Sequence, residues 1–413
     1  MERRRYPVKL FVGLDVSSFD IKVCVLSGEG EQLETFTVSN DLPGATLLRD
    51  NLLEVAKDQT IDTFKIGLES TSVYSFHPSM FLHYDKTLKD LGAQVFVMNP
   101  KQIANFKKSY ADMDKTDEID AFVIADYLRF GRNSMSVVKE EQYIALQQLT
   151  RSRYQLIHQV TTEKQHFLQH LSYKFSAFSK EVDSSVFGHA MMELFTEKYS
   201  LEELAQLPIE DLANYLQEKG KNRFNDPEQV AKSIQRAVRS SYRLNKVVED
   251  SIDVLLGTSI EVIRALQKQI KEIDKAIERI MAGLTETLQS IPGIGPVFAA
   301  GIIAEIGQIE RFEDETRIAK YAGLYWRKHQ SGRFTADDTS LSRNGNQYLR
   351  YYLVEAANSV RKRIPEYQEY YVKKYNEVPK HQHKRALVLT ARKFVRLVDA
   401  LLRNHQIYTP KGA

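Results

Sequence analysis

The first 40 residues contain three short segments that are rich in hydrophobic residues. The segments cover residues 9–16, 21–26 and 32–39. Short turn regions separate them, one of which is Ser-Gly-Glu-Gly at 27–30. Segments of this length, bounded by turn residues, are typical of β-strands. The pattern therefore predicts three consecutive strands with tight connections.

After residue 40 the hydrophobic pattern alternates between helical and strand spacing. It predicts helices at 43–55, 78–91 and 116–130, and strands at 64–68 and 94–98. A simple doubly wound sheet would place a helix after the first strand. Three strands in a meander, followed by alternating helices and strands, are the order expected of an RNase H-like fold.

The middle of the chain, from residue 140 to 285, has little glycine and loses the strand pattern. A stripe of seven apolar residues is spaced alternately by three and four positions: Ile263, Leu266, Ile270, Ile273, Ile277, Ile280 and Leu284. This heptad spacing predicts a coiled coil. The partner helix is either an earlier one, from Tyr143 to about Leu171, or the same helix of a second subunit.

A third composition begins at Ser290 and continues with IPGIGPVFAAGIIAEIG, a Gly-Pro-rich hairpin between helices, and helices continue to about Asn404. At 413 residues the chain is too long for one ordinary core. We therefore expect a mixed α/β domain at 1–139, a helical region for coiled-coil pairing and oligomerisation at 140–285, and a helical domain at 286–413.

The net charge of +3 conceals a basic C-terminal end. From Arg327 onward there are 18 Lys or Arg against 7 Asp or Glu. Such a segment indicates either a polyanionic partner such as nucleic acid or a solvated helical face. The single cysteine, Cys24, excludes an internal disulfide and favours a buried packing role in a reducing cytoplasm. No apolar run is long enough for a membrane span, so we expect no membrane partner.

Four carboxylates lie where an RNase H-like fold would bring them together. Asp15 is on the first strand, and Glu69 ends the fourth. Asp117 and Asp120 begin a helix with i, i+3 spacing, which projects both to one side. Converging carboxylates repel one another unless cations relieve them, and hard oxygen ligands favour Mg²⁺ or Mn²⁺. Three nearby aspartates compete for these roles: Asp112, Asp114 and Asp126.

The C-terminal region carries two further candidates. Gly293 and Gly295 lie in a helix-hairpin-helix-like segment, where glycines let backbone N–H groups approach a DNA phosphate; a tight turn between packed helices is the alternative. Ser331 lies in a basic loop that would help its hydroxyl act as a nucleophile, although a loop serine is more often a turn residue. The candidate phosphate-binding cations are Arg327, Lys328, Arg333, Arg343 and Arg350.

Together these motifs resemble the DEDD transposases of bridge-RNA-guided insertion sequences, which are related to the Piv-type DNA invertases. The resemblance rests on GLDVS, on GLEST leading through VMNP to KTDEIDA, and on SIPGIGPVFAAGIIAEIG followed by NGNQYLRYYLVEAA. It covers residues 8–130 and 286–360. The long helical middle matches no motif of the family.

The resemblance implies a RuvC-like domain whose acidic tetrad is Asp15, Glu69, Asp117 and Asp120. It implies that Ser331 attacks a DNA phosphodiester and holds one strand as a phosphoserine, with Ser340 and Ser342 as fallback nucleophiles. It also implies a homo-oligomer, double-stranded donor and target DNA, and a noncoding guide RNA, in the cytoplasm at the nucleoid.

Two other functions compete with a recombinase. A RuvC-like junction resolvase or nuclease would use the same carboxylates with water as nucleophile, and would attach no DNA to protein. A non-catalytic nucleic-acid scaffold would tolerate loss of any carboxylate and keep salt-sensitive binding.

Overall fold

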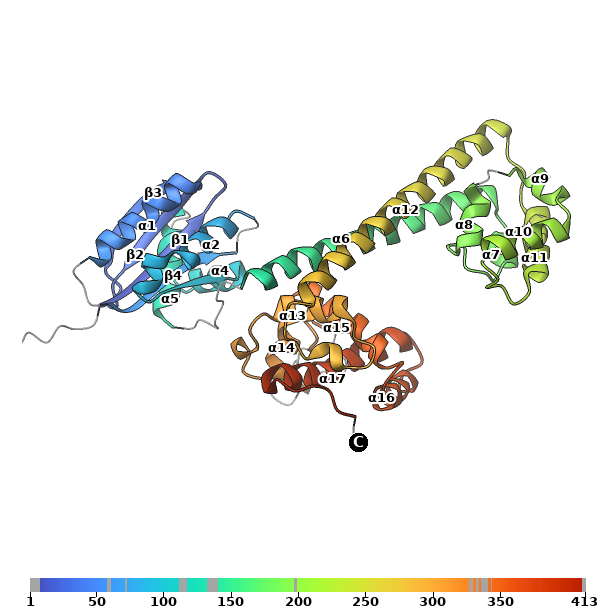
Figure 1. Ribbon diagram of the computed structural model, residues 1–413. Coiled ribbons are helices and arrows are strands. Elements are labelled where there is room, and N and C mark those ends of the chain that lie inside the picture. Colours follow the sequence, from blue (N-terminus) through green and yellow to red (C-terminus); the bar gives the residue numbers. More distant parts are fainter. Residues whose placement is uncertain are drawn as a thin grey trace, which may run out of the picture. The chain divides into compact units, whose positions relative to one another are not determined.

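The computed structural model describes residues 8–57, 61–70, 73–110, 117–131, 140–196, 199–326, 341–342 and 344–410, and the backbone of 330–331 and 334–335 (Figure 1). The chain forms two compact units. The first comprises Met1–Glu141 and Gly307–Ile318; the second comprises Gln142–Ile306 and Ala319–Ala413. The three-domain division expected from composition stays a prediction.

The first unit contains a five-stranded sheet. Its strands are β1 (Val8–Val16), β2 (Asp20–Leu26), β3 (Gln32–Ser39), β4 (Ile61–Glu69) and β5 (Ala93–Met98), in the spatial order β3-β2-β1-β4-β5. β1, β2 and β3 form an antiparallel meander, and β4 and β5 continue the sheet parallel to β1. This mixed α/β arrangement confirms the predicted strands and is consistent with an RNase H-like domain.

In the described part of this unit, five helices accompany the sheet: α1 (Leu42–Ala56), α2 (Phe76–Tyr84), α3 (Lys86–Asp90), α4 (Pro100–Lys107) and α5 (Asp117–Arg129). The single helix predicted at 78–91 was wrong, because Asp85 interrupts it and caps α3 by accepting the Leu88 N–H at 2.9 Å. α4 was not predicted. Cys24 is fully buried in the sheet, and burial raises the pKa of its thiol to about 12, as expected of a packing residue.

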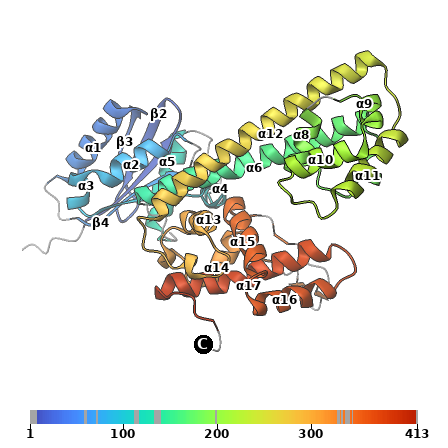
Figure 2. The same cartoon turned by 45° about the vertical axis from the view of Figure 1, so that its right-hand side comes forward.

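Two long helices, α6 (Glu141–Lys174) and α12 (Lys246–Met281), run side by side in Figures 1 and 2. Arg153 Nε contacts Asp274 Oδ1 at 2.5 Å, and Lys174 Nζ contacts Asp253 Oδ1 at 2.5 Å. Because the pairs connect an early residue of α6 to a late one of α12 and the reverse, the helices are antiparallel. The first of the two partners considered, an earlier helix of the same chain, therefore lies beside α12.

The predicted heptad stripe is only partly covered within one chain. Ile263, Ile270 and Ile277, seven residues apart, are buried, whereas the intervening Leu266, Ile273 and Ile280 are half-buried. Leu284 lies beyond the end of α12, which is Met281. Coiled-coil pairing along the full stripe stays a prediction.

The segment of the chain that follows α6 and precedes α12 forms a small helical bundle. Its helices are α7 (Phe178–Glu181), α8 (His189–Thr196), α9 (Leu201–Gln206), α10 (Ile209–Lys219) and α11 (Pro227–Ser240). They share a core in which Phe167, Phe175, Phe178 and Phe195 pack with Leu212 and Ile234. Asp226 caps α11 by accepting the Gln229 N–H.

Among the described residues of the rest of the chain, the elements are helices and one short hairpin. Its elements are η1 (Leu288–Ser290), α13 (Pro296–Ile306), η2 (Ile309–Arg311), α14 (Glu315–Tyr321), β6 (Gln330–Ser331), β7 (Phe334–Thr335), α15 (Gln347–Val360), α16 (Pro365–Asn376) and α17 (Gln382–Asn404). α13 packs against α15 so closely that a Cβ at Gly301 would lie 2.2 Å from the ring of Tyr352. None of the helices within the described ranges is both long and apolar enough to cross a membrane.

Candidate active site

Asp15 and Glu69 lie on neighbouring parallel strands at one end of the sheet. The register pairs Gly13 of β1 with Gly67 of β4. A Cβ at Gly13 would meet the backbone of α5 at 2.0 Å, and one at Gly67 would meet Leu128 of α5 at 2.6 Å. Both glycines therefore face α5, and because side chains two residues apart share a face, Asp15 and Glu69 project to that face as well.

The first turn of α5 supplies the other two carboxylates. The close approach at Gly13 is to the carbonyl oxygen of Ala121, which directly follows Asp120 in the chain. Asp117 and Asp120 both raise the pKa of Asp15, and Asp120 also raises that of Glu69. Asp15 therefore interacts electrostatically with Asp117 and Asp120, and Glu69 interacts with Asp15 and Asp120.

Burial and mutual repulsion raise the pKa of two carboxyl groups in this cluster. Burial, followed by Asp120, Asp117 and Asp20, raises the pKa of Asp15 to about 6. Burial, followed by Asp15 and Asp120, raises the pKa of Glu69 to about 7. A site of this kind gains either protons or a cation, because both relieve the same repulsion.

Lys107, the last residue of α4, is a member of the site that the sequence did not reveal. Its Nζ lies 2.5 Å from Asp120 Oδ1, and its charge lowers the pKa of both Asp15 and Glu69. α4 is held in place by the buried Ile103 and by Phe106, which packs against Tyr127 of α5. The apolar spacing of Ile103 and Phe106 could have predicted a helix there, but not its approach to the carboxylates.

The donor set fits a hard divalent cation by its chemistry, since it consists of carboxylate oxygens. Within the described residues, no three His, Cys, Asp or Glu side chains are close enough to hold an ion together. The side chains of Asp15, Glu69, Asp117 and Asp120 would therefore have to rotate inward to bind one. Lys107 would in that case give up at least part of its contact with Asp120.

Of the competing aspartates, Asp126 is occupied by its neighbours. It is buried, Arg129 Nε donates to its Oδ1 at 2.7 Å, and the hydroxyl of Tyr110 donates to its Oδ2. These contacts fit a role in packing α5. Asp112 and Asp114 lie outside the described residues.

Ser331 lies in the second unit, on a β-hairpin. Its backbone pairs with Phe334, and Gln330 pairs with Thr335, so Ser331 is the last strand residue before the connection. Its side chain lies outside the description, as do Arg327, Lys328, Arg333, Arg343 and Ser340. Ser342, a fallback nucleophile, is buried with a side-chain oxygen that has no hydrogen-bond partner, which disfavours attack on DNA.

The two hairpin glycines differ in their surroundings. Gly293 has a φ of +96°, and a Cβ there would lie 2.9 Å from the Ser359 hydroxyl, so the turn itself requires glycine. A Cβ at Gly295 would have nothing within 4 Å. Packing therefore explains Gly293, whereas the open space at Gly295 leaves room for a ligand.

Arg350, predicted to contact nucleic acid, is engaged inside the unit. Its Nη1 donates to the carbonyl oxygen of Ala322 at 3.0 Å, beside Gly323. This contact fits a role in packing α15 against the preceding loop. Contact of Arg350 with nucleic acid stays a prediction.

Comparison with known proteins places the chain in a family. A family model for transposases of the DEDD, IS110 type matches residues 12–176, and the model of the transposase IS116/IS110/IS902 family matches residues 285–372. The two segments, which together cover more than half of the chain, contain the acidic cluster and the Ser331 hairpin respectively.

Similar proteins come from insertion elements. The 44.8 kDa protein of insertion element IS116 from Streptomyces clavuligerus is 25% identical over 97% of this chain and 96% of its own length. The 42 kDa protein of insertion element IS900 from Mycobacterium paratuberculosis is 24% identical over 97% of each chain. The transposase of insertion sequence element IS1111A from Coxiella burnetii is 28% identical over 31% of this chain and 33% of its own. The chain thus belongs to the DEDD transposases of the IS110 family, enzymes that cut DNA and transfer its strands.

Proposed function

We propose that the protein is a site-specific recombinase in which Ser331 attacks a DNA phosphodiester while Asp15, Glu69, Asp117 and Asp120 hold divalent metal. Dependence on a divalent metal follows from the family, and Mg²⁺ or Mn²⁺ is our assignment from the oxygen donor set. The electrostatic coupling of Asp15 to Asp117 and Asp120, and of Glu69 to Asp15 and Asp120, supports the proposal most directly.

The chemistry assigned to Ser331 is a transesterification. Its Oγ forms a bond to the phosphorus, and the bond from phosphorus to one deoxyribose oxygen breaks. The hydroxyl proton leaves Ser331, and the departing sugar oxygen takes up a proton. The metal, when bound, stabilises negative charge on the reacting phosphate. Ser331 is the last residue of its strand before the hairpin connection. This position supports the role, because a ligand can approach the end of a strand without any helix having to move.

Further contacts are proposed for the partners. Gly295, ahead of the N-terminus of α13, is assigned to a DNA phosphate because the space above it is open. Arg327, Lys328, Arg333 and Arg343 are assigned to the DNA backbone around Ser331.

The half-buried residues of the heptad stripe on α12 support a second subunit pairing along that helix. A noncoding guide RNA that pairs with donor and target DNA is proposed from the resemblance to bridge-RNA-guided transposases.

Trapping of labelled substrate DNA on the protein tests this function. Purified protein, with the RNA that copurifies from its host and Mg²⁺, is mixed with end-labelled DNA and run on a denaturing gel. We expect a protein–DNA band in the wild type that is missing in Ser331→Ala and in Asp15→Ala. Ser251→Ala, which changes an exposed serine on α12, is the matched control and should keep the band.

Two results would contradict the proposal. DNA cleavage without a covalent band, equal in wild type and Ser331→Ala, would indicate a nuclease that uses water. Salt-sensitive DNA binding without cleavage, unaffected by Asp15→Ala, would indicate a scaffold.

A further inference from the structure

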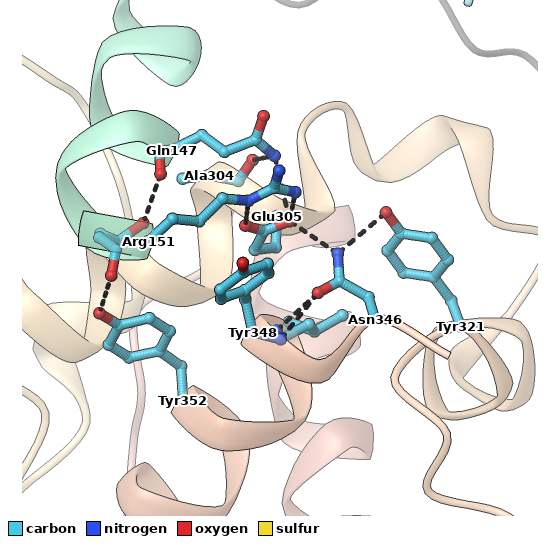
Figure 3. A network of polar contacts seen from close by, with 10 residues as sticks. Gln147, Arg151, Ala304, Glu305, Tyr321, Asn346, Tyr348 and Tyr352 are labelled. Atoms are coloured by element: carbon cyan, nitrogen blue, oxygen red, sulfur yellow. Dashed lines mark hydrogen bonds and ion pairs between the residues drawn. The ribbon is translucent and has the colours of Figure 1, made fainter. Parts of the chain in front are cut away.

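A buried carboxylate on α13 joins three helices of the second unit. The Glu305 side chain is fully buried, and it accepts two hydrogen bonds from Arg151 of α6, at 2.7 and 2.9 Å (Figure 3). Gln147, one turn earlier on α6, donates to it at 3.0 Å, and the amide of Asn346 donates at 2.6 Å. Both oxygens of Glu305 are therefore occupied by donors from distant parts of the chain.

Asn346 connects this cluster to the beginning of α15. Its side-chain oxygen caps the helix by accepting from the backbone N–H groups of Tyr348 and Leu349, each at 3.0 Å. Its amide nitrogen donates to Glu305 and, at 3.1 Å, to the hydroxyl of Tyr321 (Figure 3). Because both ends of the amide are used, the side chain has one satisfactory orientation.

The same residues close the neck of the hairpin that carries Ser331. The backbone N–H of Asn346 donates to the backbone carbonyl oxygen of Tyr321 at 2.7 Å, and the backbone N–H of Ser342 donates to that of Tyr325 at 2.8 Å. Nearer the strands, Trp326 and Leu341 form an isolated β-bridge. The incoming segment, 321–326, is thus connected at three points to Leu341, Ser342 and Asn346 of the segment that follows the hairpin.

We propose that Glu305 is a positioning residue that, through Arg151 and Asn346, holds the hairpin neck and so orients Ser331. The proposal rests on the proposed role of Ser331. A buried ion pair contributes little net stability compared with well-packed apolar residues, because both charges lose their hydration. The pair instead fixes the orientation of the side chains around Glu305, because the planar guanidinium of Arg151 and the amide of Asn346 each donate to Glu305 in one geometry.

Two variants separate positioning from simple stability. Glu305→Gln removes the charge but keeps the shape, and leaves Arg151 without a charged partner. We expect a lower melting temperature. The double variant Arg151→Met/Glu305→Gln removes both charges, so we expect the melting temperature to return toward the wild-type value.

The rate of DNA attachment, unlike the melting temperature, is expected to stay low in the double variant. In single-turnover reactions at saturating DNA, both variants should attach DNA at least about tenfold more slowly per folded molecule, with unchanged DNA affinity, because misplacement of a nucleophile by about 1 Å has effects of this size or larger. Hydrogen exchange at the amides of Ser342, Asn346 and Leu349 should accelerate in both variants. This second measurement needs no DNA.

Asp253→Asn is the matched control. It breaks another buried ion pair, that of Lys174 with Asp253 between α6 and α12, and Lys174 is the last residue of α6, 23 residues beyond Arg151. We expect it to lower the melting temperature but to leave the attachment rate per folded molecule and the exchange of the neck amides unchanged.

The outcomes separate this inference from the proposed function. If the wild type attaches DNA and the double variant attaches it at the wild-type rate once stability has returned, Glu305 is structural only and the inference is wrong. Unchanged exchange of the neck amides in both variants would also overturn it. If the wild type forms no Ser331 adduct, the proposed function fails, and the inference about Ser331 fails with it.

Discussion

Lys107 Nζ and Asp120 Oδ1 lie 2.5 Å apart, so the acidic cluster carries a cation of its own. Lys107 is on α4 and Asp120 on the first turn of α5, and each is partly exposed. A divalent metal drawn to the same carboxylates therefore competes with an ammonium group already beside them. We therefore expect Lys107 to lower the affinity of the cluster for a divalent metal.

Replacement of this lysine should strengthen metal binding. Lys107→Met removes a positive charge next to Asp120, Asp15 and Glu69, so we expect the affinity for Mn²⁺ to rise about tenfold in DNA-free protein, as for one unit charge a few ångströms away in a partly solvated site. Isothermal titration calorimetry measures it. Lys101→Met, at the exposed beginning of the same helix, is the control and should bind Mn²⁺ as the wild type does. Equal or weaker binding by Lys107→Met would contradict the competition.

The pKa values of the cluster predict how stability depends on pH. The pKa of Asp15, about 6, and that of Glu69, about 7, lie above the values of an unfolded chain. The folded protein therefore binds more protons than the unfolded one, so its stabilisation is complete at low pH and is lost as pH rises through 6 to 7. In EDTA we expect the melting temperature of the first unit to fall by roughly 2–4 °C from pH 5 to pH 8.

Two further measurements test the origin of this trend. Asp15→Asn should flatten the profile, because one of the raised carboxyls is gone. Saturating Mn²⁺ should reverse its direction, because metal binds the deprotonated carboxylates. A melting temperature that rises with pH in EDTA would show that the cluster does not hold its protons in the folded state.

Gly13 determines how closely α5 approaches the sheet. Gly13→Ala would place a methyl carbon 2.0 Å from the Ala121 carbonyl oxygen, which is backbone and cannot rotate away. We expect a loss of more than about 3 kcal/mol in the free energy of unfolding of this unit, which is the range of severe overpacking. Urea unfolding measures it. Gly28→Ala, where the nearest atoms belong to the side chain of Lys9, is the milder control; equal effects of the two would argue against the close contact.

Alanine substitution at the two glycines of the hairpin before α13 should affect different properties: stability at Gly293 and DNA binding at Gly295. Gly293→Ala forces a φ of +96° on an L-residue and should lower the free energy of unfolding by about 1–2 kcal/mol. Gly295→Ala meets nothing within 4 Å and should fold normally. If the backbone there approaches a phosphate, Gly295→Ala should weaken DNA binding severalfold at each salt concentration, with an unchanged salt slope because no charge is lost. Wild-type DNA affinity in Gly295→Ala would leave this hairpin a structural turn.

Local periodicity was sufficient to predict much of the first unit. The three-strand meander and the positions of β4, β5 and α5 follow from patterns that span only a few residues. Strand order, the period of two in a strand and the i, i+3 spacing in a helix indicated which carboxylates could share a face. Because Asp114 and Asp117 have the same spacing as Asp117 and Asp120, the choice of Asp117 with Asp120 relied partly on the family resemblance. Cys24 as a packing residue follows from its apolar surroundings in the same way.

Contacts between distant residues were decided only in the tertiary structure. Lys107 reaches Asp120 because α4 packs on α5, and Glu305 meets Arg151 and Asn346, which are 154 and 41 residues away in the chain. The antiparallel pairing of α6 with α12 is of the same kind, since the heptad stripe was equally compatible with a second subunit. Periodicity determines which face of an element is apolar, but the partner of that face depends on how all the elements pack, and ion pairs form only where packing brings their charges together.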